Sequence, residues 1–152
     1  MKKIKIIGIV IVALAVIIQF IPAQLPETST NNPNDLLANN EIPDSIASLF
    51  INGCYDCHSN QTVYPWYSNI QPTAWLVVRD TKLGREQLNF SDWESFPIKK
   101  KLKILNETAA VIEEKEMPFP PYMLIHKKAR FSAEERKRMI KWTERFGEEL
   151  FN

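Results

Sequence analysis

The sequence predicts an all-α protein, because apolar residues recur every three to four positions and no segment alternates apolar with polar residues as a strand does. Two long helices show this pattern most clearly. The first covers residues 98–116, and the second covers residues 132–150, which Ser132 and Glu135 open as a capping box. Their apolar stripes are formed by Leu102, Leu105, Ala109 and Ile112 in the first helix and by Met139, Trp142, Phe146 and Leu150 in the second.

Three shorter helical segments complete the predicted domain, and each is marked by a residue that begins or ends a helix. These marker residues are Asp44, Gly53, Pro72, Gly84 and Ser91. The prolines within residues 118–121 prevent a helix from continuing, and residues 123–130 are expected to form a loop. A chain of 152 residues is long enough for one domain with its own core.

The N-terminus predicts export from the cytoplasm. The chain starts with Met1-Lys2-Lys3, and Lys5 is followed by an apolar run from Ile6 to Ile21 that only Gln19 interrupts. As a helix the run is about 24 Å long, which is shorter than the ~30 Å hydrocarbon core of a bilayer. However, no clean cleavage site follows it. Residues 1–22 are therefore expected to be a signal anchor, with a cleaved signal peptide as the alternative, and the body is expected to face the periplasm in the cell envelope.

Residues 23–40 are rich in Pro, Asn, Thr and Ser and are expected to be a flexible linker between the membrane helix and a domain at 41–152. The charge of the chain is balanced, with 19 basic and 18 acidic side chains, which argues against a nucleic-acid partner. The lysine-rich stretches at 99–103 and 127–130 are local and are expected to be solvated.

One motif carries the chemistry. Cys54-Tyr55-Asp56-Cys57-His58 has the spacing at which two thiols form thioethers with a haem and the following histidine binds its iron. Cys54 and Cys57 are therefore expected to hold one haem c covalently, with His58 as the proximal ligand. Three alternatives remain open: a redox dithiol, although no βαβ pattern surrounds the pair; a zinc site that also uses His126; and a disulfide.

The second axial ligand is expected to come from the C-terminal half. Met117 lies between a helix and a proline, in a loop that could present its thioether to iron, and methionine ligation raises the reduction potential. Met123 and His126 are the alternatives, as is an open site, whereas Met139 is expected in the core. Flat aromatic side chains near the motif are expected to line the pocket, and arginines could pair with the haem propionates. These residues are Tyr64, Trp66, Tyr67 and Trp75 for the pocket and Arg79 and Arg85 for the propionates.

Two longer stretches carry a resemblance beyond the motif. They read CYDCHSNQTVYPWYSNIQPTAWLVVRDTKLGREQLNFSDW and EMPFPPYMLIHKKARFSAEERKRMIKW. Over about residues 40–148 the chain resembles the bacterial haem-binding domain family. The resemblance implies one covalently bound haem in a small helical, cytochrome-c-like fold, with Cys54, Cys57 and His58 at the attachment site and Met117 as the distal ligand.

These observations favour a non-enzymatic electron carrier that exchanges single electrons with redox partner proteins and is tethered to the membrane by its N-terminal segment. The alternative is a haem enzyme or a gas or peroxide sensor with an open distal site. Peroxide chemistry would need a distal acid–base group, and His126 is the only spare histidine.

Overall fold

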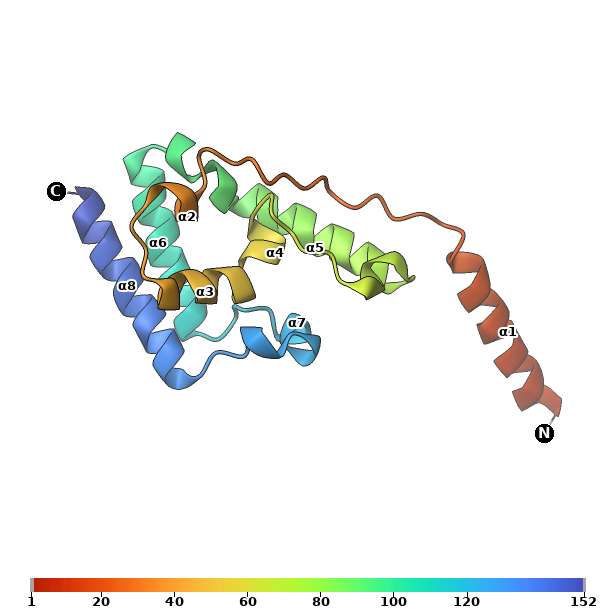
Figure 1. Cartoon of the computed structure of the whole chain (residues 1–152). Helices are drawn as coiled ribbons and strands as arrows, with labels where there is room; N and C mark the ends of the chain where they lie inside the picture. The colour runs from red at the N-terminus through yellow and green to blue at the C-terminus, as the bar shows by residue number, and fades with distance from the viewer. Residues whose placement is uncertain (1, 152) are drawn as a thin grey trace.

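The structure is a computed structural model that describes residues 2–151, and within this range the chain forms helices and loops but no strand (Figure 1). The predicted all-α class is therefore confirmed. The α-helices are α1 Lys2–Ile18, α2 Leu36–Asn39, α3 Asp44–Gly53, α4 Tyr55–His58, α5 Thr73–Gln87, α6 Ile98–Glu113, α7 Pro120–Ile125 and α8 Ala133–Phe151. Short 3-10 turns form at η1 Trp66–Asn69, η2 Phe90–Ser95 and η3 Lys127–Ala129.

The core lies between the α6–α8 pair and the shorter helices that carry the motif. Helices α6 and α8 lie side by side, and the predicted stripes meet between them, with Leu105, Met139 and Trp142 all buried. Phe50 of α3 packs edge-on against both Trp142 and Phe90, with ring centroids 5.4 and 5.2 Å apart. These aromatic contacts join α3 to the long helices, so the segment that precedes the motif is fixed in the core.

Local signals place most of the helix ends. The capping box forms as expected: the Ser132 N–H donates to Glu135 Oε2 at 2.7 Å, and the Glu135 N–H donates to Ser132 Oγ at 3.2 Å. Helix α6 ends at Glu113, before the expected Glu116, because Lys115 takes the left-handed conformation with φ 62°. Residues 123–130, expected as a loop, instead continue α7 and form η3.

The predicted flexible linker at 23–40 is structured at its C-terminal end. Asp35 caps α2 by accepting the Leu37 N–H at 2.9 Å, and both Asp35 and Leu36 are buried. The sequence reading missed this because so short a helix leaves no periodic pattern. The body therefore begins before residue 41.

Helix α1 is apolar, carries no buried residue and extends away from the body (Figure 1). Among the helices of residues 2–151, none combines the length and the apolar character needed to cross a bilayer, so the expectation of a membrane-spanning helix at the N-terminus is not supported.

Candidate haem-binding site

The motif sits at a corner between two helices. Helix α3 ends at Gly53, Cys54 adopts a non-helical conformation, and one turn of helix α4 then carries Cys57 and His58. The N–H groups of Cys57 and His58 both donate to the carbonyl of Cys54, at 3.2 and 2.9 Å. This single turn brings the three predicted haem-binding side chains to one end of the core.

Two glycines permit the close packing of this corner. A Cβ atom on Gly84 of α5 would lie 2.5 Å from the carbonyl oxygen of Cys57 and 3.0 Å from its carbonyl carbon. A Cβ atom on Gly53 would lie 2.8 Å from Cγ of Pro118 and would overlap the ring of Phe131. The backbone of the motif is therefore pressed against α5 on one side and against the segment after Met117 on the other.

The ring of His58 is oriented by a backbone carbonyl. Its Nδ1–H donates to the carbonyl oxygen of Leu88 at 3.1 Å, which leaves Nε2 without a proton and available to bind a metal. Burial lowers the pKa of His58 below its ordinary value of 6.5, although hydrogen bonds with the backbone oppose this shift. A neutral imidazole with a fixed tautomer is the form that ligates iron.

Two adjoining cavities open beside His58. The larger has a volume of about 530 Å³, within the range of ligand pockets, and the smaller has a volume of about 190 Å³. Both are lined by Gly53, His58, Gln87 and Met117. Cys54 lines the larger cavity and Cys57 lines the smaller one, so the two thiols reach different parts of the space around His58.

The two cysteines are free thiols, and they are not joined in a disulfide. Burial raises the pKa of Cys54 to about 12 and that of Cys57 to about 11, so both are protonated at neutral pH. A redox-active dithiol needs a lowered thiol pKa, so this geometry does not favour that alternative. Within residues 2–151, no group of three or more His, Cys, Asp or Glu side chains could hold a metal ion, so the zinc alternative has no support either.

Met117 is the candidate distal ligand that shares both cavities with His58. Its backbone is fixed, because its N–H donates to the carbonyl of Val111 at 3.1 Å and its carbonyl accepts from Arg136 Nη1 at 3.1 Å. Met123 and His126 line neither cavity, and Met139 is fully buried in the core, as expected.

A family model described as a haem-binding domain matches residues 13–145. The chain belongs to the haem-binding domain family. No curated protein and no solved structure matches the chain significantly. The matched range begins before residue 41, so it includes the segment in which Asp35 and Leu36 are buried.

The side chains of this haem-binding domain fit the cofactor that the family implies. A neutral imidazole and a thioether share the same cavities, two protonated thiols lie beside them, and Phe90, Ile104 and Phe131 give the larger cavity an apolar wall. These are the ligand types and the surroundings that a haem requires.

The aromatic residues predicted for the pocket lie elsewhere in the haem-binding domain. Tyr64 and Tyr67 line a third cavity of about 140 Å³, which Cys57 also lines but Cys54 does not. Trp66 is 76% exposed and Trp75 is 37% exposed, and neither lines any of the three cavities. Their predicted place in a haem pocket therefore has no support from this geometry.

The two arginines proposed for the propionates have other partners in the haem-binding domain. Arg79 is paired with Asp80 at 2.7 Å. Arg85 donates to the carbonyl oxygens of Ser59 and Glu27, at 2.8 and 2.7 Å, and to Thr62 Oγ1 at 2.9 Å. Arg85 thus ties the end of the motif and the linker to α5.

Sequence reasoning did not assign α6 to the site, although this helix contributes more residues to the larger cavity than any other element. The α6 residues along the larger cavity are Lys103, Ile104, Glu107, Thr108, Val111 and Ile112. One signal was available, because Ile104 and Val111 are seven positions apart and lie beside the predicted core stripe. The Leu88 carbonyl, which orients His58, could not be identified from the sequence, because every residue has a backbone carbonyl.

Proposed function

We propose that the chain binds one haem c covalently through Cys54 and Cys57, with His58 and Met117 as the axial ligands of the iron, and that it transfers single electrons. The main observation in support is that His58, whose Nδ1–H donates a hydrogen bond to the Leu88 carbonyl, lines the same two cavities as Met117. When bound, the haem supplies a reversible one-electron change at its iron.

The protein's own groups then set the conditions for this change. The carbonyl of Leu88 holds His58 in the tautomer that exposes Nε2 and increases its basicity. Phe90, Ile104 and Phe131 give the larger cavity an apolar wall, which would raise the reduction potential in the same direction as a methionine ligand does. The chain is thus expected to act as a carrier rather than as an enzyme.

The location and partners follow from the N-terminal segment as part of the same proposal. The lysines before the apolar run support export of the body to the cell envelope, either anchored and facing the periplasm or released into it. The attachment of haem c takes place outside the cytoplasm in bacteria, so the motif and the segment agree. The expected partners are redox proteins of that compartment.

Covalent attachment is tested first. The full chain, produced with a haem-attachment system, is run on a denaturing gel and stained for haem. We expect staining of the wild type, strong loss in Cys54→Ala and Cys57→Ala, and complete loss in the double variant. A wild type that carries no haem on the denatured polypeptide would contradict the proposal.

The distal ligand is tested by absorption and ligand binding. We expect the weak long-wavelength band of methionine-ligated ferric haem in the wild type and its loss in Met117→Ala, together with fast cyanide binding. Met123→Ala is the matched control and should keep the band. If Met117→Ala keeps the wild-type spectrum, the sixth ligand is a different group.

A second candidate function has one specific observation in its favour. Asp56 and Tyr122 line the smaller cavity, Tyr122 Oη donates to Asp56 Oδ2 at 2.6 Å, and the Tyr122 ring stacks on His126 at 3.9 Å. Titratable groups beside an open iron site could move protons in peroxide chemistry or in gas sensing. Fast cyanide binding by the wild type itself, with no methionine band, would favour this candidate over the electron carrier.

A further inference from the structure

Gln19, which interrupts the apolar N-terminal run, is the residue that joins this segment to the body. Its Oε1 accepts the N–H of Gln71 at 3.0 Å, and its Nε2 donates to the carbonyl of Gln71 at 3.1 Å. In return, Nε2 of Gln71 donates to the carbonyl of Ile21 at 2.9 Å. Gln71 is buried, so these three hydrogen bonds fix α1 relative to the start of α5.

Helix α1 exposes a continuous apolar surface, and contact of such a surface with water is unfavourable. It is apolar on all sides from Ile6 to Ile17, every residue in that range is exposed, and its N-terminus carries lysines. A continuous apolar surface of this kind marks a contact with a lipid or with another apolar partner. Because the helix meets the body at Gln71, whatever covers it also lies next to the neighbouring part of the body.

A second apolar surface lies on the body at that end, and we call it the η1–α7 face. It is formed by Val63, Trp66, Leu76, Leu124 and Ile125. Val63, Leu76 and Ile125 surround the third cavity together with Tyr67, whose ring packs edge-on against Trp66 with centroids 5.8 Å apart. Val63 and Leu124 are both 75% exposed, so nothing in the chain covers the face.

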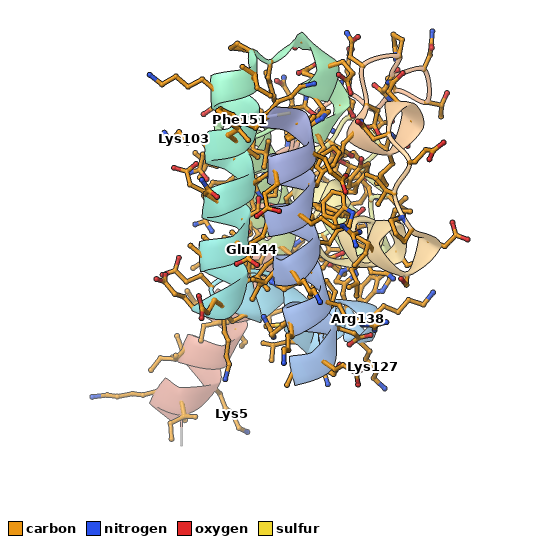
Figure 2. All side chains as sticks on the ribbon, turned by 90° about the vertical axis from the view of Figure 1, so that its left-hand side faces the viewer. Lys5, Lys103, Lys127, Arg138, Glu144 and Phe151 are labelled. Atoms are coloured by element: carbon orange, nitrogen blue, oxygen red, sulfur yellow. The ribbon has the colours of Figure 1, made fainter. Side chains whose placement is uncertain are left out.

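The exposed charges that follow this face along the chain are basic, whereas Asp56 and Asp80 line the third cavity itself. Lys127 and Lys128 follow Ile125 and are exposed. Figure 2 shows Lys127 and Arg138 at the lower end of the body, toward which the more distant α1 also points, whereas Phe151 lies at the upper end. Exposed apolar side chains, a tryptophan and lysines are the composition of surfaces that rest among anionic lipid headgroups.

We propose that the η1–α7 face rests on an anionic lipid surface into which α1 inserts. The Gln19–Gln71 hydrogen bonds fix the orientation of α1 relative to this face. This inference rests on the proposed envelope location and does not depend on the haem. A lipid surface is favoured over a protein partner because the apolar face, the lysines and the apolar helix all lie at one end of the molecule.

The test is lipid labelling of the full holoprotein in vesicles of phosphatidylethanolamine and phosphatidylglycerol that contain a photoactivatable phospholipid. Cross-linked peptides are located by mass spectrometry. We expect labels within residues 2–21 and also within 63–67 and 119–128. Ile98 and Phe151 are the internal control. Both are exposed and apolar, and they line the same surface cavity at the opposite end of the body, so they should stay unlabelled.

Three variants sharpen the test, one of them a control. Lys127→Glu with Lys128→Glu should lower the labelling of α7 several-fold while α1 stays labelled, and Lys99→Glu with Lys100→Glu should change nothing. Gln19→Leu should keep the labelling of α1 and reduce that of the η1–α7 face.

The inference would be overturned by labels confined to residues 2–21, by equal labelling at Ile98 and Phe151, or by a mature chain that lacks residues 1–22. Cross-links between two copies through the η1–α7 face would assign the face to a second chain and would also overturn it. The haem spectrum, recorded on the same samples, reports separately on the proposed function.

Discussion

Two tyrosine–aspartate pairs hold the two sides of the candidate haem site, and they differ in burial. On the side of the motif, Tyr55 Oη donates to Asp35 Oδ1 at 2.8 Å, and both residues are buried. On the side of Met117, Tyr122 Oη donates to Asp56 Oδ2 at 2.6 Å in a half-exposed setting. The first pair belongs to the core, whereas the second joins a surface helix to it.

The surroundings of the pairs differ in the same way. Asp35 Oδ2 also accepts from Ser91 Oγ at 3.1 Å and from Gln61 Nε2 at 3.0 Å, so the buried carboxylate has four donors with the Leu37 N–H. Helix α7, in contrast, has no buried residue. The side of the motif should therefore open only when the domain unfolds, whereas the α7 side can open locally. An external ligand is expected to enter past α7.

The largest expected effect is that of Asp35→Ala. It would leave the buried hydroxyls of Tyr55 and Ser91 without their acceptor, so we expect the free energy of unfolding to fall by about 3 kcal/mol. Urea denaturation of the full chain measures this change. Asp44→Ala, at an exposed position, is the control, and a loss at Asp35 no larger than that of the control would contradict the comparison.

The next effect concerns the close contact between α5 and the motif. Gly84→Ala would place a Cβ atom 2.5 Å from the Cys57 carbonyl oxygen, and we expect a loss of about 2 kcal/mol from the overpacking. Gly147→Ala is the matched control, because its Cβ atom would meet Leu102 and Leu105 at 3.6 Å, an ordinary contact. That variant should be stabilised by about 0.5 kcal/mol. Thermal unfolding that gave both variants the same sign would be evidence against this packing.

Phenylalanine variants of Tyr122 and Tyr55 allow a direct comparison of the α7 side with the motif side. Tyr122→Phe should lower the free energy of unfolding by about 1 kcal/mol and accelerate cyanide binding, because it frees α7 from Asp56. Tyr55→Phe should cost more stability, about 2 kcal/mol, and leave the rate of cyanide binding unchanged. Stopped-flow mixing measures the rates, and an equal acceleration in both variants would show that α7 is not the entry side.

The smallest effect is a pH dependence at the start of α8. Hydrogen bonds with the Ser132 N–H and hydroxyl hold the pKa of Glu135 below its ordinary value of 4.5. This contribution is fully present above pH 4.5 and is lost as the pH falls through the lowered pKa. The protection factors of the amides at residues 133–136, which compare exchange with the intrinsic rate at the same pH, should therefore fall below pH 4.5 in the wild type. In Glu135→Gln the protection factors of these amides should stay constant over the same pH range.

The two sides also differ in how well the sequence predicts them. The motif, the helix before it and the capping box follow from short-range spacing, so Cys54, Cys57 and His58 could be assigned to one site directly. Met117 could be named only as one of several candidates, because its place depends on how the chain folds back. One long side of the larger cavity comes from α6, about 50 residues after the motif, and local aromatic density at Trp66 and Trp75 was a poor guide to it.

The burial of Asp35 and Leu36 sets the minimum length of a protein fragment for laboratory work. A fragment that starts at residue 41, where composition places the boundary, lacks the carboxylate that binds Tyr55 and the side chain that α2 contributes to the core. It would also lose the contacts of Pro26 with Tyr64 and of Glu27 with Arg85. A soluble fragment suited to spectroscopy or crystallisation should therefore begin at about residue 24.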